Sequence, residues 1–206
     1  MYARSTTVRG NPEKLDDGIA YVRDKVMPAV QQMDGCVGLS MLVAHDSGRS
    51  ITTTAWVDLA AMRRNAENIR PIREKTAELM GGSADVAEWE IAVLHRIHET
   101  HDGACARVIW TTGDPARVDE TIDAFRMTMI SRIEELPGFC SVSVMVDRQS
   151  GRSAIAVTYD DRDAMQQAQE RGMALRREFN RHLGRETTEV AEFDVVLAHL
   201  RVPEKV

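Results

Sequence analysis

Hydrophobic positions recur in the same order in the two halves of the chain. In each half, a short apolar stretch leads into a long segment whose apolar residues return every three or four positions, as on one face of a helix. Two apolar runs joined by Ser-Gly-Arg-Ser follow, and that spacing is typical of a β-hairpin. A second helical segment and a last apolar strand close each half. The pattern therefore predicts the order β-α-β-β-α-β twice.

Helix starts are marked by short polar residues. Asn11 and Asp114 are natural N-caps and each precedes a proline, which suits the first helical position. Asp58 and Asp161 stand in the same way before the second helix of each half. The strands are predicted at residues 3–8, 36–43, 51–56 and 87–95, and again at residues 106–111, 140–146, 154–159 and 191–199.

The two halves are copies of one unit. When each residue is placed over the residue 103 positions later, the Gly-Asn-Pro at 10–12 meets the Gly-Asp-Pro at 113–115. The Ser-Gly-Arg-Ser at 47–50 likewise meets its copy at 150–153. A match this extensive indicates a duplication.

One extra residue in the second half shifts the alignment by one position. We place it near Pro71, where the second helix is predicted to be interrupted by Pro71 in one half and by Gly172 in the other. The sequence thus predicts a unit at residues 1–96, a linker at 97–104 and a second unit at 105–206.

Charge and composition exclude several classes of partner. The 206 residues carry 26 Lys+Arg against 32 Asp+Glu, for a net charge of -6, so the basic surface of a nucleic-acid binder is not expected. No apolar stretch approaches the roughly 18 residues of a membrane span. The three cysteines, Cys36, Cys105 and Cys140, do not suggest a disulfide framework. We expect a soluble, cytoplasmic protein without nucleic-acid or membrane partners.

Two kinds of segment connect the chain to a known family. One is the glycine-containing exit from the first helix, Met-Asp-Gly-Cys at 33–36 and Leu-Pro-Gly-Phe at 136–139. The other is a strand that ends in an aromatic residue before a capped helix, at 54–62 and 158–165. In these segments the chain resembles the dimeric α/β-barrel superfamily, and in particular tandem antibiotic-biosynthesis-monooxygenase (ABM) domains. The resemblance implies an α+β fold in which two ferredoxin-like units pair within the chain as a pseudo-dimeric α/β barrel with antiparallel sheets.

The resemblance also implies two classes of function. One is a monooxygenase that needs no cofactor and acts on a small aromatic substrate of the quinol or anthrone type. The other is a noncatalytic protein of the same fold that binds a small aromatic or apolar ligand or acts under stress, so catalysis is left open, as is further association into homo-oligomers. The haem-degrading members place an Asn on the first strand and a Trp and a His on the second helix. This chain departs from that pattern, which disfavours haem degradation.

The ligand pocket implied by the family lies between the sheet and the helices of a unit. In the second unit, His182, Tyr159 and Asn180 are the candidate catalytic residues, since histidine titrates near neutral pH and can relay a proton. The structural alternative for His182, a surface histidine in the last turn of a helix that the helix dipole favours, is the preferred interpretation. The candidate substrate-binding residues are Trp110, Trp56, Asn65 and Arg107.

Each substrate-binding candidate has a structural alternative. Paired aromatic residues such as Trp56 and Tyr159 also fit a duplicated core. Arg107 repeats as Arg4, and a buried strand arginine needs a partner, for which Glu192 and Glu88 are the matching choices. The first unit has no counterpart of Trp110 or His182, so it is the candidate for a degenerate site.

A cluster of potential metal ligands lies outside the repeat, in the linker. Its spacing matches no known metal motif, so a solvated linker is favoured over a metal site and no metal is assigned. The residues concerned are His95, His98, Glu99, His101, Asp102 and Cys105.

Overall fold

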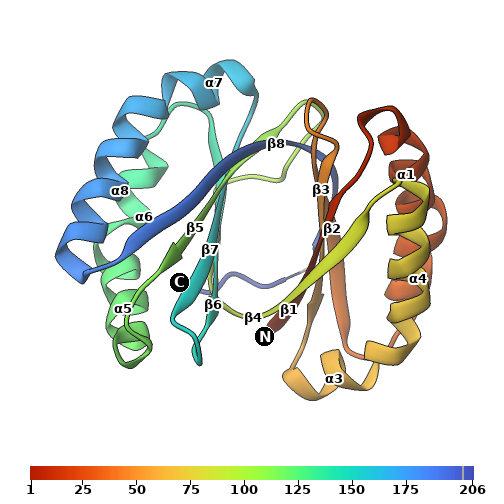
Figure 1. Ribbon diagram of the computed structural model, residues 1–206. Coiled ribbons are helices and arrows are strands. Elements are labelled where there is room, and N and C mark those ends of the chain that lie inside the picture. The colour runs from red at the N-terminus through yellow and green to blue at the C-terminus, as the bar shows by residue number, and fades with distance from the viewer. Residues whose placement is uncertain (201) are drawn as a thin grey trace. The chain divides into compact units, whose positions relative to one another are not determined.

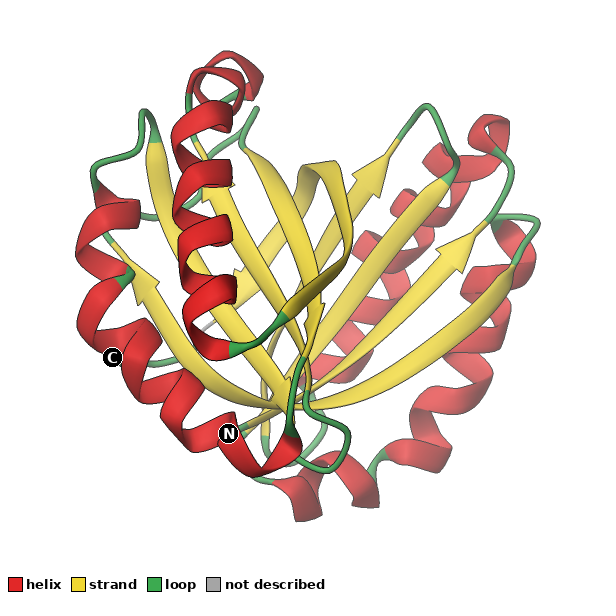
Figure 2. Ribbon diagram, turned by 60° about the vertical axis from the view of Figure 1, so that its left-hand side comes forward, coloured by secondary structure: helices red, strands yellow, loops and turns green. Residues whose placement is uncertain are grey.

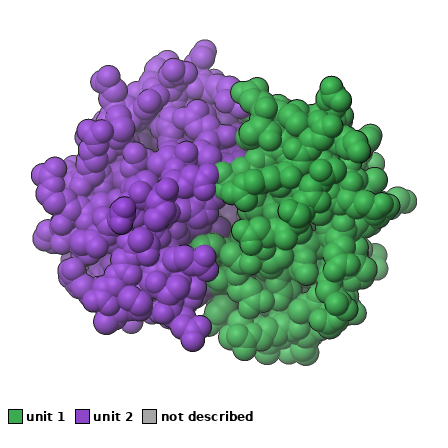
Figure 3. Space-filling model, viewed as in Figure 1, with its two compact units in different colours: residues 1–89, 194–202 green, residues 90–193, 203–206 purple. Residues whose placement is uncertain are grey.

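The computed structural model describes residues 1–200 and 202–206 and divides into two compact units. Unit 1 comprises Met1–Trp89 and Asp194–Val202, and unit 2 comprises Glu90–Phe193 and Pro203–Val206 (Figure 3). In each unit, helices cover one face of an antiparallel sheet (Figures 1 and 2). Among the described residues, no helix combines the length and apolar character needed to cross a lipid bilayer.

The first repeat follows the predicted order of elements. Its first helical segment is divided into a 3-10 turn, two α-helices and an intervening π-helical turn, a local widening of the helix. The elements are β1 (Tyr2–Arg9), η1 (Pro12–Lys14), α1 (Leu15–Tyr21), η2 (Val22–Val26), α2 (Met27–Gln31), β2 (Cys36–Ala44), β3 (Arg49–Trp56), α3 (Leu59–Arg64), α4 (Ala66–Leu79) and β4 (Ser83–Arg96).

The second repeat has the same order. Its first helical segment is divided at Met129 and not by a π-helical turn. The elements are β5 (Cys105–Thr112), η3 (Pro115–Arg117), α5 (Val118–Thr128), α6 (Ile130–Glu134), β6 (Phe139–Asp147), β7 (Arg152–Tyr159), α7 (Arg162–Gln167), α8 (Gln169–Leu183) and β8 (Glu186–Leu200).

The strands are hydrogen-bonded in the closed order β1-β3-β2-β8-β5-β7-β6-β4. The hairpins β2–β3 and β6–β7 are antiparallel, as their turn sequences predicted. Order and pairing confirm the predicted α+β class with tandem βαββαβ repeats and antiparallel strands.

β4 and β8 are longer than the sequence predicted. Their first residues are mostly polar and largely exposed, so no hydrophobic pattern marks them. Residues 90–96 of β4 pair with β6 in unit 2, and residues 194–200 of β8 pair with β2 in unit 1. The compact units therefore divide within these two strands. The loop between Arg96 and Cys105 coincides with the predicted linker. The domain boundaries at residues 96 and 105 remain a prediction.

The predicted caps are present in both repeats. Asn11 and Asp114 each accept a hydrogen bond from the backbone N–H two residues later, at 3.0 and 2.9 Å. Asp58 and Asp161 accept from the N–H three residues later, at 2.6 and 2.8 Å. These bonds satisfy N–H groups that a helix leaves without an internal partner.

The interruption of the second helix was misplaced. The break falls at Asn65 in the first repeat and at Ala168 in the second, whereas Pro71 and Gly172 both lie inside continuous helices. Proline removes one helical hydrogen bond and leaves the carbonyl of Glu67 without its usual donor. Pro71 and Glu67 are both exposed, so water can satisfy that carbonyl.

The position of the extra residue was also wrong. Gly81 and Gly184, 103 residues apart, both end a helix with positive φ angles of 68° and 64°. The turns that follow are alike, because the residue after each glycine donates to a carbonyl five residues earlier. The offset of 103 is thus kept to the end of the helix, and the extra residue lies in β8, between Glu186 and Glu192. As a result, Ile69 of α4 corresponds to Gly172 of α8.

Candidate functional site

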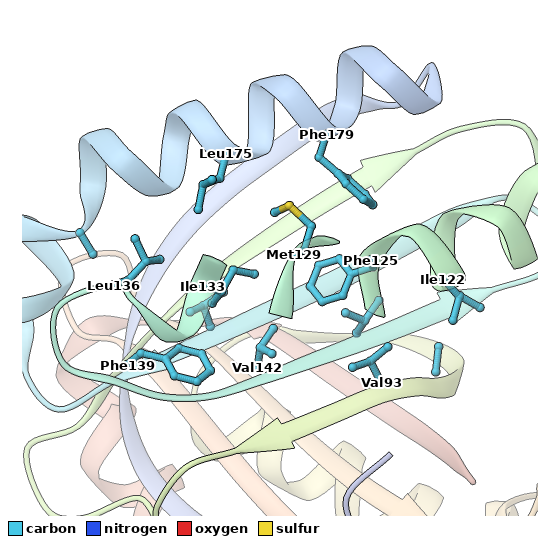
Figure 4. Close-up of a cluster of buried hydrophobic side chains, with 14 of the residues drawn as sticks. Val93, Ile122, Phe125, Met129, Ile133, Leu136, Phe139, Val142, Leu175 and Phe179 are labelled. Atoms are coloured by element: carbon cyan, nitrogen blue, oxygen red, sulfur yellow. The ribbon is translucent and has the colours of Figure 1, made fainter. Parts of the chain in front are cut away.

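A cavity of ≈150 Å³ lies inside unit 2, between its sheet and its helices. β5 and β7 form its floor, and α5, α6 and α8 form its walls. Figure 4 shows the apolar part of this interior, with Leu175 and Phe179 pointing from α8 toward the side chains of α5 and α6. Its apolar lining includes Ile109, Phe125, Met129, Ile133, Leu136, Ile155, Val157, Leu175 and Phe179.

Polar side chains line part of the same cavity. Arg107 is 7% exposed, and its Nε and Nη2 donate to Oε1 of Glu192 at 3.1 and 2.6 Å. Nη2 also donates to the backbone carbonyl of Met165 at 3.2 Å. The pairing predicted for Arg107 is therefore present, and Arg4 pairs with Glu88 in the same way at 2.6 Å.

Arg176 is the second guanidinium at the cavity. It is half-buried on α8, and among the described residues no hydrogen bond or ion pair satisfies it. Burial lowers the pKa of Arg176, and the nearby Arg107 and Arg177 lower it further. A half-buried cation without a counterion provides a binding position for an anion.

Tyr159 closes the cavity at the end of β7. It is 2% exposed, and the guanidinium carbon of Arg107 lies 5.9 Å from the centre of its ring. Burial raises the pKa of the Tyr159 hydroxyl above its ordinary value of 10.0, and the positive charge of Arg107 opposes that shift. The hydroxyl is therefore neutral at physiological pH and available as a hydrogen-bond donor.

Asn180 also lines the cavity. Its side chain is oriented by a hydrogen bond from Nδ2 to Oγ1 of Thr187, at 2.9 Å. The structure thus brings together three of the residues singled out from the sequence, Tyr159, Asn180 and Arg107.

The other residues singled out lie elsewhere. His182 is exposed on the last turn of α8 and is not part of the cavity lining. Arg107 and Ile109, two residues apart on β5, point to the face of the sheet that lines the cavity. Trp110 is the next residue, so its ring lies on the opposite face. There it meets Phe193 edge-on, with 6.5 Å between ring centres.

Trp56 and Asn65 belong to unit 1. Trp56 is fully buried in the core and its Nε1 donates to Oγ1 of Thr54 at 3.1 Å. The Asn65 amide donates to the carbonyls of Asp34 and Ala61, at 3.2 and 2.9 Å. Both side chains are therefore held by partners within unit 1.

Sequence reasoning missed the parts played by Gly172 and Arg176. Gly172 lines the cavity at a position where the first repeat has Ile69, which is 6% exposed and packs in the core of unit 1. This difference can be read from the sequence if the offset of 103 is kept along the whole helix. Arg176 flanks the apolar stripe of α8 in the sequence, but only the folded structure shows that it lies at a cavity and has no partner among the described residues.

The linker residues do not form one cluster. His95 binds Oε1 of Glu134 at 2.5 Å, and Cys105 is buried beside Met165. His98 and His101, in contrast, both approach Asp160, which also accepts a hydrogen bond from Cys140.

Comparisons with known proteins agree with this architecture. No family model matches the chain. The uncharacterised protein Rv2558 of Mycobacterium tuberculosis is 48% identical over 207 residues, which span 100% of this chain and 88% of that protein.

Three solved structures share the fold at low sequence identity. A Fusobacterium nucleatum protein provisionally named a monooxygenase has a TM-score of 0.71 at 13% identity, covering 97% of this chain and 94% of its own. An anthrone oxidase-like protein has a TM-score of 0.66 at 15% identity, covering 100% and 95%. A ferredoxin-fold protein of Listeria monocytogenes, related to antibiotic biosynthesis monooxygenases, has a TM-score of 0.53 at 7% identity, covering 95% and 95%. At these identities the three structures confirm the fold that the sequence resemblance implied.

Proposed function

We propose that this chain, which belongs to the same family as Rv2558 of Mycobacterium tuberculosis, is a monooxygenase that oxidises a small quinol- or anthrone-like aromatic in the unit 2 cavity without a cofactor. The names of the structural neighbours support the reaction class. The observation that carries the proposal is the half-buried guanidinium of Arg176, which has no partner among the described residues and lies beside the apolar part of the cavity. It offers an ion pair to the oxygen of an aromatic substrate that has lost its hydroxyl proton.

Cavity size favours a single-ring substrate. An apolar cavity of about 150 Å³ is known to accommodate benzene, and the cavity of unit 2 has the same volume. A single ring of the hydroquinone type is close to this volume, whereas the three rings of an anthrone exceed it. We therefore place single-ring quinols first among the substrates.

The reaction balances with dioxygen as the oxidant. A hydroquinone that has lost one hydroxyl proton transfers an electron to O2, and the two radicals combine to form a C–O bond at the ring. Protonation gives a hydroperoxide, whose O–O bond breaks as water leaves. One oxygen atom stays in the hydroxyquinone and the other departs in water, so no further reductant is consumed.

The cavity residues have distinct parts in this mechanism. Both Arg107 bonds go to Oε1 of Glu192, so Oε2 is open among the described contacts and serves as the base that takes the substrate proton. Arg176 stabilises the anion that results, and the neutral hydroxyl of Tyr159 donates to the peroxide oxygen. Asn180 orients the ring through its amide oxygen.

The test is oxygen consumption by chelator-treated protein with hydroquinones, anthrones and flavonoid-like aromatics. We expect Arg176→Met to lower kcat/KM by about 10- to 100-fold, the effect of losing one hydrogen-bonded ion pair in a partly buried site. Arg177→Met removes an exposed arginine next to it and is the matched control. His182→Ala is expected to leave turnover within about twofold, because His182 lies outside the cavity lining.

The outcomes of this test separate the oxygenase from the ligand-binding alternative. Turnover that is lost in Arg176→Met and kept in Arg177→Met supports the proposal. Aromatic anions that bind through Arg176 without consuming oxygen would replace it with the ligand-binding alternative. Equal turnover in Arg176→Met and the wild type would remove Arg176, and with it this mechanism.

A further inference from the structure

Four side chains with metal-binding donor atoms meet at one end of the unit 2 sheet. His98 and His101 come from the loop between β4 and β5, Cys140 lies in β6, and Asp160 follows β7. Oδ1 of Asp160 is close to a donor atom of each of the other three. It lies 3.3 Å from Nε2 of His98, 3.2 Å from Nε2 of His101 and 3.2 Å from Sγ of Cys140.

These distances resemble the spacing of ligands around a single ion. In tetrahedral Zn²⁺ sites, bond lengths of about 2.0 to 2.3 Å place neighbouring ligand atoms roughly 3.4 Å apart. The donor atoms of His98, Cys140 and Asp160 all lie within 4.8 Å of one another. Imidazole, thiolate and carboxylate are the three donor types that Zn²⁺ takes from proteins.

We propose that His98, Cys140 and Asp160 form a Zn²⁺ site that fixes the linker to the ends of β6 and β7. His101, whose Nε2 lies 3.2 Å from Oδ1 of Asp160, is the neighbouring side chain that completes the site as the fourth ligand. Two ligands come from the loop between β4 and β5, one from β6 and one from the residue after β7, so the ion cross-links these three segments. Binding converts the Cys140 thiol to a thiolate, and the displaced Sγ proton leaves to solvent.

The positions in unit 1 that correspond to Cys140 and Asp160 hold residues without donor side chains. The backbone bond from Asp160 N–H to the Gly138 carbonyl, 2.8 Å, is repeated by Val57 and Gly35 at 2.9 Å. At an offset of 103, Val57 takes the place of Asp160 and Val37 takes the place of Cys140. The fold forms this strand end with two valines, so it does not require the thiol and the carboxylate of unit 2.

Without the ion, the thiol and the carboxylate satisfy each other. Cys140 is buried and donates to Asp160, and burial, reinforced by the Asp160 charge, raises the pKa of the thiol to about 12. A divalent cation between the two groups reverses that effect of Asp160, because it stabilises both negative charges at once.

The site is next to the cavity in sequence. Asp160 directly follows Tyr159, whose ring lines the cavity, so bound Zn²⁺ would fix the backbone that positions that ring. This is a structural role, and it is independent of whether the cavity is catalytic.

The test begins with Zn²⁺ added to the purified full-length protein, followed by dialysis and elemental analysis. We expect one equivalent of Zn²⁺ per chain to be retained. Co²⁺ in its place is expected to give a thiolate-to-metal charge-transfer band and the visible bands of a tetrahedral site. In Cys140→Ser the charge-transfer band is expected to disappear.

Two further variants complete the experiment. His98→Ala/His101→Ala changes exposed loop residues only, so it keeps the core intact, and it should weaken binding about 100-fold or more. His45→Ala, at an exposed histidine elsewhere in the chain, is the matched control and should bind like the wild type. Failure to retain stoichiometric metal, or retention that neither the Cys140 nor the double histidine variant reduces, would overturn the proposal.

Discussion

Gly172 of α8 and Ile69 of α4 occupy the same position in the two repeats, and each is the fourth residue of its helix. Ile69 is 6% exposed and fills the interior of unit 1 with its side chain. Gly172 lines the cavity of unit 2. One substitution between the copies thus replaces a packed core side chain by a residue that lines a cavity.

Restoring the isoleucine should close the cavity. In Gly172→Ile we expect affinity for aromatic ligands to fall about tenfold or more, because the new side chain occupies the space of the ring. Gly172→Ala is the control. Its Cβ meets Leu136 Cδ1 at 3.8 Å, an ordinary contact, so it should stabilise the helix by about 0.5–1 kcal/mol and keep binding. Urea unfolding and ligand titration measure both effects, and unchanged affinity in Gly172→Ile would contradict the assignment.

Tyr159 should ionise later than an ordinary tyrosine. Its folded-state pKa is raised by burial, so the folded protein retains this proton above pH 10.0, where the unfolded chain loses it. The contribution to stability is complete below pH 10.0 and is lost as the pH rises through the folded pKa. An absorbance titration of tyrosinate in the wild type minus Tyr159→Phe measures the step. A step at or below pH 10.0 would show that burial does not control this group.

Glu90 should contribute to stability at neutral pH and not in acid. Arg148 donates to its carboxylate through Nε at 2.6 Å and Nη2 at 3.3 Å, and this hydrogen bonding lowers the pKa of Glu90 below 4.5. A lowered folded pKa gives stability that is present above pH 4.5 and disappears as the pH falls through the folded value.

Glu90→Gln is therefore expected to lose about 1 kcal/mol of unfolding free energy at pH 7 and to approach the wild type near pH 3. Glu186→Gln, at an exposed glutamate of β8, should stay within about 0.5 kcal/mol. Denaturant unfolding at both pH values decides the point, and an equal loss at both would argue against a charge effect.

Asn65 should matter for folding and not for the cavity. Its buried amide is the donor to the carbonyls of Asp34 and Ala61, so Asn65→Ala leaves these acceptors short of a partner at the break between α3 and α4. We expect a loss of about 1–2 kcal/mol in unfolding free energy. Asn68→Ala, at an exposed position of α4, should cost less. Weaker binding of aromatic ligands in Asn65→Ala at a temperature where it stays folded would contradict this separation.

Most of the fold was predictable because its signals are local. The caps of Asn11 and Asp161 use hydrogen bonds that span two or three residues, so sequence spacing alone identifies them. The helix break was misplaced because that prediction also relied on a local signal alone. Pro71 is a local breaker on average, but an exposed helix face allows water to replace the bond that it removes.

The candidate site was predictable in part. Tyr159 and Arg107 lie on strands whose period of two assigns them to the helix-covered face, and the structure places both at the cavity. Trp110 has the opposite parity on the same strand as Arg107, a signal that sequence reasoning did not use. His182 lies two residues beyond Asn180, the last residue of α8 in the cavity lining, and a helix pattern alone does not show where the covered part of a helix ends.

The sequence by itself determined the duplication, the order of elements and the helix caps, because each depends on residues close together in the chain or on direct comparison of the two copies. The tertiary structure decided where space remains and which distant side chains meet. The cavity depends on the combined volumes of side chains from several elements, and His98, Cys140 and Asp160 are 42 and 20 residues apart along the chain. Such relationships depend on packing in three dimensions, which no local pattern of residues specifies.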